Sequence, residues 1–201
     1  MPAAAVVQNE RGGTARSRLR TLEDLRAVTC SLEEGASAAQ LQRLQHQSQL
    51  AITGTGADVW GGSPQHDDQY GAIYQSQSFS SGTTETVTVD QLDNTSPWAK
   101  AGIMVRNDMT AAGSSAGYAV MAVTPSYGVV LEYDSNGDGY LDSEARTGGI
   151  KAPVWLRLTR TGSQVSGYYS TNGTNLHPGR VGGEPVRGER DRGRGCLPHL
   201  P

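Results

Sequence analysis

An acidic loop at residues 134–142 has the residue types and the spacing of a calcium-binding loop. Oxygen-bearing side chains fall at alternate positions of this loop, and calcium prefers roughly six to eight oxygen ligands. Gly139 would permit the sharp turn that such a loop needs. The predicted ligands, with Tyr140 contributing its backbone carbonyl, are Asp134, Asn136, Asp138, Tyr140 and Asp142.

The same loop also has a purely structural interpretation. Its Asn-Gly and Asp-Gly pairs, which begin at Asn136 and Asp138, both favour tight hairpin turns. The final position of a calcium hand, usually a bidentate glutamate, is Ala145 here, and Glu144 comes one residue early. The flanking segments also have the pattern of strands. A structural calcium ion and a plain turn therefore both remain open.

A second group of residues has the chemistry of a sugar-binding surface, because aromatic rings stack on the apolar faces of sugars. The aromatic candidates are Trp60, Tyr70, Tyr74, Trp98, Tyr127 and Tyr140. Trp98 and Trp155 are expected to pack in or beside the core. Trp60 and Tyr70 flank a polar loop at residues 61–69, which favours a surface position. We predict carbohydrate binding by Trp60, Tyr70 and Tyr74.

Acidic residues near these aromatics leave a catalytic alternative open. Paired carboxylates hydrolyse glycosidic bonds, and the available acids include Asp58, Asp67, Asp68 and Asp108. His66, beside Asp67, has the chemistry to bind a metal or to exchange protons, although loops of this kind are usually only solvated. The spacing singles out no pair of acids, and we predict no catalytic residue. The sequence has no nucleophile elbow, phosphate loop or His-Glu-x-x-His motif.

Short segments of alternating residues must position these side chains. About eight such segments, with turn signals between them, run from residue 50 to residue 175. They predict an all-β protein with an antiparallel β-sandwich. The residues expected in its core are Ile103, Val105, Leu131, Val154, Leu156 and Leu158, whereas Trp155 and Arg157 should point the other way.

The two ends of the chain lack this alternation. Residues 1–49 are expected to form a disordered or weakly helical segment, with disorder up to residue 18, a short helix from Thr21 and a second from Ser37. Residues 176–201 are rich in arginine, glycine and proline, and should be a disordered tail or an out-of-frame continuation. The predicted sandwich domain therefore covers residues 50–175.

Charge and composition exclude several classes of protein. The formal net charge is -3, and residues 50–175 contain six basic against twelve acidic residues, so nucleic acid is not an expected partner. No stretch approaches the ~20 apolar residues of a membrane span. The N-terminus shows no recognisable secretory signal. Cys30 and Cys196 form neither a disulfide framework nor a zinc site.

Several sequence runs together resemble a known family. They are GADVWG at residues 56–61, WAKAGIMVR at 98–106, APVWLRLTR at 152–160 and GYYSTNGT at 167–174. The chain resembles the concanavalin A-like jelly-roll (laminin G-like) modules appended to bacterial secreted glycoside hydrolases and other carbohydrate-active proteins. The resemblance implies a jelly roll, a secreted parent family and a non-catalytic role.

The expected function is that of a non-catalytic, carbohydrate-associated binding module, a piece of a larger secreted protein. Its expected partner is a polysaccharide or glycan, with no nucleic acid and no membrane, and we expect a monomer. One alternative is a glycoside hydrolase, or part of one, that acts through paired acids. Another is a degenerate fragment with no independent activity. A reducing-sugar assay separates the binding module from the hydrolase, because only the hydrolase releases product.

Overall fold

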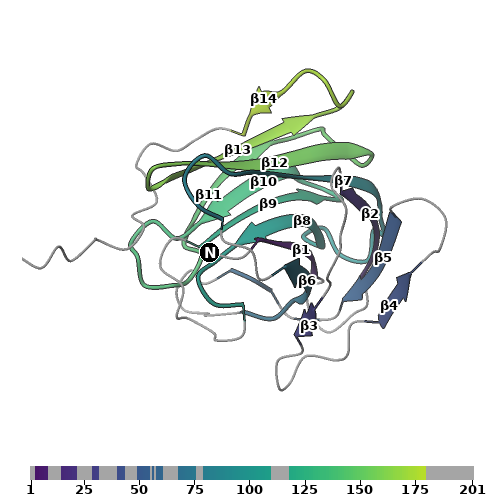
Figure 1. Cartoon of the computed structure of the whole chain (residues 1–201). Helices are drawn as coiled ribbons and strands as arrows, with labels where there is room; N and C mark the ends of the chain where they lie inside the picture. The colour runs from purple at the N-terminus through teal and green to yellow at the C-terminus, as the bar shows by residue number, and fades with distance from the viewer. Residues whose placement is uncertain are drawn as a thin grey trace, which may run out of the picture.

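The computed structural model describes residues 3–8, 15–21, 29–31, 40–43, 49–54, 56, 58–60, 68–75, 79–109 and 118–179. These residues form two seven-stranded antiparallel sheets, and no helix occurs among them (Figure 1). It follows that no helix in these ranges is long and apolar enough to span a membrane. The two sheets share one core, which is consistent with the expected sandwich.

The first sheet, called sheet A, contains the four strands that the structure describes between residues 100 and 147. Its strand order is β11 (Ser143–Thr147), β10 (Gly128–Tyr133), β9 (Ala119–Thr124), β8 (Lys100–Val105), β1 (Ala3–Gln8), β6 (Gly71–Gln75) and β3 (Thr29–Ser31). Strand β1 lies between β6 and β8, where Ala5 is level with Ile73 on one side and with Ile103 on the other. Strands β8 to β11 are successive antiparallel neighbours.

The second sheet, called sheet B, contains the strands that end the described chain. Its strand order is β14 (His177–Pro178), β13 (Gln164–Ser170), β12 (Val154–Thr161), β7 (Thr84–Leu92), β2 (Ala15–Thr21), β5 (Gln49–Gly54) and β4 (Gln40–Arg43). Strands β12 and β13 form a tight hairpin, in which Thr161 pairs with Gln164. Strand β12 also pairs with β7, which places residues about 70 positions apart in the sequence side by side.

Alternation along the strands fills the core between the sheets. The six residues predicted to be buried, Ile103, Val105, Leu131, Val154, Leu156 and Leu158, all lie in this core, and the prediction is confirmed. Strand β12 follows the pattern closely, because its residues alternate between buried and half-buried from Val154 to Thr159. A shift of one residue in register would have exchanged the two sets.

A glycine closes the hairpin between β9 and β10. Gly128 has a φ of 81°, and a Cβ atom at this position would lie 2.1 Å from the carbonyl oxygen of Thr147. Beside it, the hydroxyl of Thr124 donates to the Gly128 carbonyl at 3.0 Å and accepts from the Tyr127 N–H at 3.0 Å. This turn therefore fixes the backbone that carries Tyr127.

The N-terminal segment differs from the sequence-based expectation. Instead of helices after Thr21 and Ser37, the described parts of this region are the short strands β3 and β4, and β1 and β2 lie where disorder was expected. The weak apolar stripe of the segment is too short to stabilise a helix alone, whereas pairing with β5 to β8 satisfies the backbone. Both sheets therefore include strands from before residue 50. Residues 22–28 and 32–39 lie outside the described residues.

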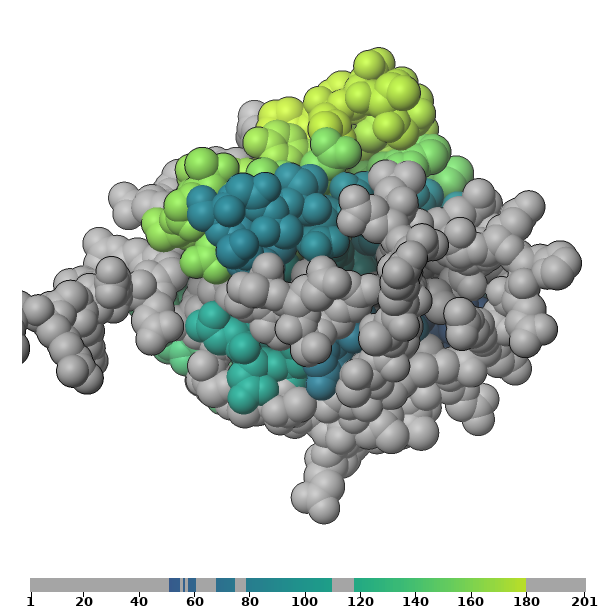
Figure 2. All heavy atoms as spheres, in the orientation of Figure 1, coloured from purple at the N-terminus to yellow at the C-terminus, as the bar shows by residue number. Residues whose placement is uncertain are grey.

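The C-terminal end of the described chain is an exposed edge of sheet B. Strand β14 pairs with β13 through Tyr168 and Tyr169, and the Gly179 N–H donates to the Gly167 carbonyl at 2.9 Å. Figure 2 shows this yellow segment on the surface, and residues 171–178 are exposed. The expected tail begins at residue 176, so its first residues belong to the sheet. Residues 180–201 lie outside the described residues.

Candidate functional site

Strand β8 carries charged side chains on the face of sheet A that points away from the core. The odd-numbered residues of β8 lie in the core between the sheets, whereas Lys100, Met104 and Arg106 lie on the opposite side, as the alternation predicts. We call this side the outer face of sheet A. A second buried cluster covers it, formed by Val59, Tyr70, Ala72, Met104, Met109, Tyr118, Val120, Ala122, Val130 and Leu141.

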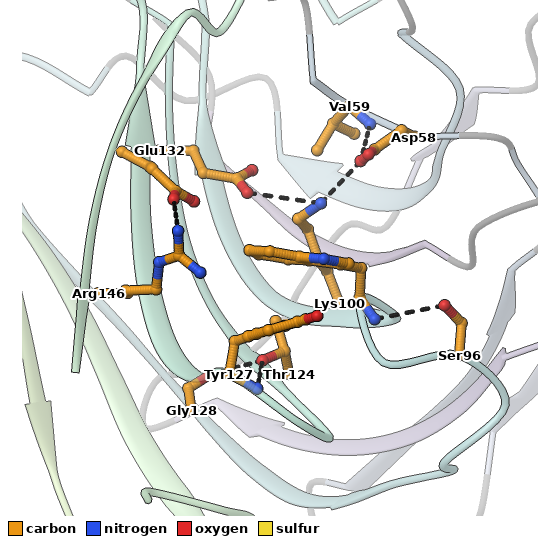
Figure 3. Close-up of polar contacts among 11 residues, drawn as sticks. Asp58, Val59, Ser96, Lys100, Thr124, Tyr127, Gly128, Glu132 and Arg146 are labelled. Atoms are coloured by element: carbon orange, nitrogen blue, oxygen red, sulfur yellow. Dashed lines mark hydrogen bonds and ion pairs between the residues drawn. The ribbon is translucent and has the colours of Figure 1, made fainter. Parts of the chain in front are cut away.

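Lys100 lies between two carboxylates on this outer face (Figure 3). Its Nζ donates to Asp58 Oδ1 at 2.7 Å and lies 3.4 Å from Glu132 Oε1. The side chains of Lys100 and Glu132 are 2% and 1% exposed, whereas that of Asp58 is 18% exposed. Asp58 Oδ1 also accepts a hydrogen bond from the Val59 N–H at 2.7 Å. One cation therefore faces two acids in a nearly dry environment.

The surplus of acidic groups over Lys100 has its main effect on the pKa of Glu132. Burial raises the pKa of Glu132 to about 7, although Lys100 opposes the shift, and the nearby Asp58 and Glu144 add to it. Glu144 lies directly opposite Glu132 in the β10–β11 register. Among the described residues, Glu132 Oε2 has no hydrogen-bond partner. Burial alone would lower the pKa of Lys100, but Glu132 and Asp58 outweigh burial and raise it.

Arg106 forms a different arrangement at the other end of β8. Its Nη1 donates to both oxygens of Asp68, at 2.8 and 3.0 Å, and to the Tyr70 hydroxyl at 2.9 Å. The guanidinium also lies 4.5 Å from the centre of the Tyr118 ring. Arg106 is 1% exposed and Asp68 7% exposed. These contacts attach the chain segment before β6 to the outer face of sheet A.

Burial influences the pKa of both groups in the Arg106–Tyr118 contact. Burial alone would lower the pKa of Arg106, but Tyr118, Asp68 and Tyr70 raise it above its ordinary value. The pKa of Tyr118 is raised chiefly by burial and secondly by Asp68. Both groups therefore keep their protons throughout the physiological range. The Arg106 group fits a structural role better than a proton-transfer role.

A stacked aromatic pair adjoins the Lys100 group. The ring centroids of Trp98 and Tyr127 are 4.0 Å apart, with an angle of 25° between the ring planes. The Arg146 guanidinium is 5.2 Å from the Trp98 centroid and 5.6 Å from the Tyr127 centroid, so it lies beside the stack rather than over one face. Arg146 also forms an ion pair with Glu144. Both rings are half-buried, and the Arg146 side chain is 45% exposed.

The predicted sugar-binding residues all pack on the outer face of sheet A. Trp60 and Tyr74 are half-buried and contact the second cluster, and Trp60 forms a backbone bridge with Leu141. Tyr70 departs from the expected surface position, because it is only 8% exposed and its hydroxyl donates to the Met109 carbonyl at 3.2 Å. Of the three, only Trp60 and Tyr74 retain exposed ring area. His66 and Asp67 lie outside the described residues.

The stacking of Trp98 on Tyr127 was not predicted from the sequence. Trp98 and Tyr127 lie in separate turns, and the Ser126 N–H joins these turns by donating to the Pro97 carbonyl at 3.3 Å. The β8–β9 register, in which Ala101 pairs with Val123, places the two turns at the same end of this strand pair. That pairing could have been derived by aligning the two strands around their shared apolar pattern. Glu132 was also missed, although a charge within an aliphatic strand is itself a signal.

The acidic loop follows β10 and binds its own backbone. Asp134, which is 1% exposed, accepts hydrogen bonds from the Gly137 N–H at 2.6 Å and the Gly139 N–H at 3.0 Å. Asp142 accepts from the backbone and the hydroxyl of Ser135, at 2.8 and 3.0 Å. The remaining contacts, Asn136 to the Asp138 N–H at 2.8 Å and Asp138 to the Tyr140 N–H at 2.9 Å, are of the same kind.

The loop is therefore ordered by its own side-chain oxygens, which accept hydrogen bonds from its backbone N–H groups. Its predicted calcium ligands lie in one turn, but in the described part of the chain no group of three or more acidic, histidine or cysteine side chains converges as a metal site. Each carboxylate oxygen that caps an N–H still has lone pairs available for a cation. The donor chemistry fits calcium, which binds oxygen ligands only.

The described geometry offers three chemical features on one side of sheet A: a buried ammonium between two acids, an aromatic pair beside an exposed arginine, and an oxygen-rich loop. No family model, no curated protein and no solved structure matches the chain.

Proposed function

We propose that the chain is a non-catalytic carbohydrate-binding module of the concanavalin A-like jelly-roll class. The observation that supports this proposal is the half-buried Trp98–Tyr127 stack beside the exposed Arg146 side chain. A sugar needs an apolar ring surface for its C–H groups and nearby fixed polar groups for its hydroxyls. Both kinds of group are present at this edge of the outer face.

The polar groups at this edge are suited to neutral sugar hydroxyls. The Arg146 guanidinium is oriented by Glu144 and by the aromatic stack, so its remaining N–H groups keep a defined direction. Glu144, with 23% of its side chain exposed, supplies the matching acceptors. Trp60 lies on the same face and provides a second aromatic contact for a longer chain. A shallow site of this kind binds weakly, because little surface is buried.

Titration of tryptophan fluorescence with soluble polysaccharides tests the proposal. Trp98→Ala should abolish the response and Tyr127→Ala should weaken it. Trp155→Ala is the matched control, since Trp155 belongs to β12 of sheet B and should leave binding unchanged. An unmodified, folded protein that responds to no glycan would contradict the proposal. Release of reducing ends by the protein would contradict its non-catalytic part and favour the hydrolase.

The proposal includes a structural calcium ion in the acidic loop. Asp134, Asp138 and Asp142 lie close in one turn between β10 and β11, and like charges held together repel one another. A divalent cation removes that repulsion and stabilises β11, which carries Glu144 and Arg146. With Ala145 in place of the usual glutamate, the dissociation constant should be near ~10⁻⁴ M.

Thermal unfolding in chelator and in excess calcium tests this part. Calcium should raise the Tm in a concentration-dependent way, because it binds the folded state only. Asp138→Ala should remain folded and lose the effect, whereas Asp93→Ala, which changes an acid outside the loop, should keep it. Superimposable melting curves for the unmodified protein would show that the loop is only a turn.

A further inference from the structure

The Lys100 group contains the three functional groups that form an amide bond. An amine, Lys100 Nζ, contacts a carboxylate of Asp58 at 2.7 Å, and a second carboxylate, Glu132, lies 3.4 Å from the same nitrogen (Figure 3). The partners come from different parts of the chain: Lys100 begins β8, Glu132 belongs to β10, and Asp58 precedes β6. We propose that Lys100 and Asp58 condense into an intramolecular amide cross-link, with Glu132 as the proton-transfer group.

Burial provides the first support for this inference. Lys100 and Glu132 are almost completely sealed from solvent, so the amine is held against its partner and water does not compete for it. Fixed contact between two reacting groups replaces a bimolecular encounter and raises their effective concentration greatly. Asp58 is 18% exposed, which leaves a route by which the water produced can leave.

The protonation state of the group provides the second support. An ammonium cannot attack, so Lys100 must first transfer a proton. Glu132 is a suitable acceptor because burial raises its pKa to about 7 and because its Oε2 has no hydrogen-bond partner among the described residues. Transfer of the proton to Glu132 works against the raised pKa of Lys100, but it replaces two buried charges by two neutral groups, which lowers the desolvation cost.

The reaction is balanced without any other reagent. The neutral Nζ attacks the Asp58 side-chain carbonyl carbon, and a C–N bond forms. One C–O bond then breaks, and the departing oxygen leaves as water with two protons that came from the lysine ammonium. Glu132 carries protons between nitrogen and oxygen and ends in its starting state. The products are one amide and one water molecule, and no electron is transferred.

Mass spectrometry of the intact, folded protein tests the inference directly. The expected mass is lower than the sequence mass by one water molecule. Tryptic digestion should yield a peptide of residues 44–106 with this deficit, uncut after Lys100, because an amidated lysine is not a trypsin site. A full sequence mass in a protein that unfolds cooperatively would overturn the inference and leave an ion pair only.

The same digest excludes other losses of water. Cyclisation of Asp138 at Gly139 would also remove one water, but it lies outside this peptide; a deficit found only there would overturn the inference. A deficit within residues 44–106 with normal cleavage after Lys100 would overturn it too. Since these readouts use the unmodified chain, they remain decisive even where a variant fails to fold.

Matched variants test the roles of the residues. Lys100→Arg and Glu132→Gln should show the full sequence mass, whereas Lys151→Arg and Glu144→Gln should keep the deficit. Lys151 is an exposed lysine, and Glu144 is the acid directly opposite Glu132 in the register. An undiminished deficit in Glu132→Gln would overturn the proton-transfer role, and a deficit in Lys100→Arg would overturn the cross-link.

Discussion

Two buried cations lie at the ends of β8 on the same face of one sheet, Lys100 at its first residue and Arg106 directly after its last, and the two are neutralised in different ways. Arg106 meets a single acid, Asp68, and its Nη1 donates to both oxygens of that acid and to the Tyr70 hydroxyl. Lys100 meets two acids, Asp58 and Glu132, and one carboxylate oxygen is left without a partner among the described residues. One group is matched in charge, and the other has an excess of acid.

The contrast follows from the chemistry of the two cations, because the lysine ammonium is a compact point charge and the arginine guanidinium is planar. A guanidinium presents several N–H groups in fixed directions, keeps its proton and ties a loop to a sheet. An ammonium has no fixed directions, and its pKa responds to its surroundings, so it can exchange protons with a neighbouring acid. The matched Arg106 group therefore stabilises the fold, whereas the unmatched Lys100 group has the potential for chemistry.

The largest expected effect is the order of stability of two variants. Arg106→Met leaves Asp68 buried without its partner and should cost about 3–5 kcal/mol of the free energy of unfolding. Lys100→Met also removes a cross-link that closes a loop of 42 residues, which is worth about 4 kcal/mol, and it leaves two acids without a cation. Lys100→Met should therefore be the less stable variant in urea denaturation.

One further variant sharpens this order. Arg106→Lys keeps a positive charge beside Asp68 and should be more stable than Arg106→Met, but it loses the guanidinium contact with the Tyr118 ring and should be less stable than the parent. If Lys100→Met proves more stable than Arg106→Met, the Lys100 group contributes only an ion pair to stability.

A smaller effect concerns pH. While Lys100 is an ammonium, without the cross-link, Glu132 has a pKa of about 7 in the folded protein against an ordinary value of 4.5, so the folded state binds more protons than the unfolded chain between these values. The free energy of unfolding should therefore fall as pH rises from about 4.5 to 7, by about 3 kcal/mol from this group, and then level off. Glu132→Gln should lack this contribution, as the difference between urea curves across this pH range will show.

Variants in the neighbouring groups separate Glu132 from other acids. Glu144→Gln should retain most of the pH dependence, because burial is the main cause of the shift at Glu132. Identical pH profiles for the parent and Glu132→Gln would contradict the assignment.

The smallest effect on stability is expected at the exposed edge of the same face. Arg146→Ala removes a half-exposed ion pair and a contact beside the Trp98–Tyr127 stack, which should change stability by less than about 1 kcal/mol. Glycan affinity should fall in the same variant, by about tenfold if one charge-assisted hydrogen bond is lost. Calorimetric titration and thermal unfolding together measure both effects. A loss of stability without a loss of affinity would place the ligand elsewhere.

Much of the fold could be predicted from the sequence because alternation is a local signal. Val154, Leu156 and Leu158 read as one face of a strand, and they line the core. The N-terminal strands β1 to β4 could not be predicted, because their residues have weak preferences of their own and become strands through partners that are distant in sequence.

The candidate site was predictable only in part for a similar reason. The acidic loop is continuous in the sequence, so its turn geometry could be expected from the Asn-Gly and Asp-Gly pairs. The Lys100 group is assembled from three separate segments, and no spacing relates Asp58 to Glu132. Tyr70 was assigned to the surface because it follows a polar loop, but its hydroxyl has partners within the structure that favour burial.

The brevity of β14 has a consequence for how the protein behaves in concentrated solution. This edge of sheet B ends in a strand of only two residues, His177 and Pro178, and proline has no N–H to offer to another strand. Strand β14 covers β13 at Tyr168 and Tyr169, which leaves fewer of its hydrogen-bonding groups to a second molecule. A second molecule finds little template there, and this edge should resist the strand-by-strand polymerisation that unprotected sheets invite.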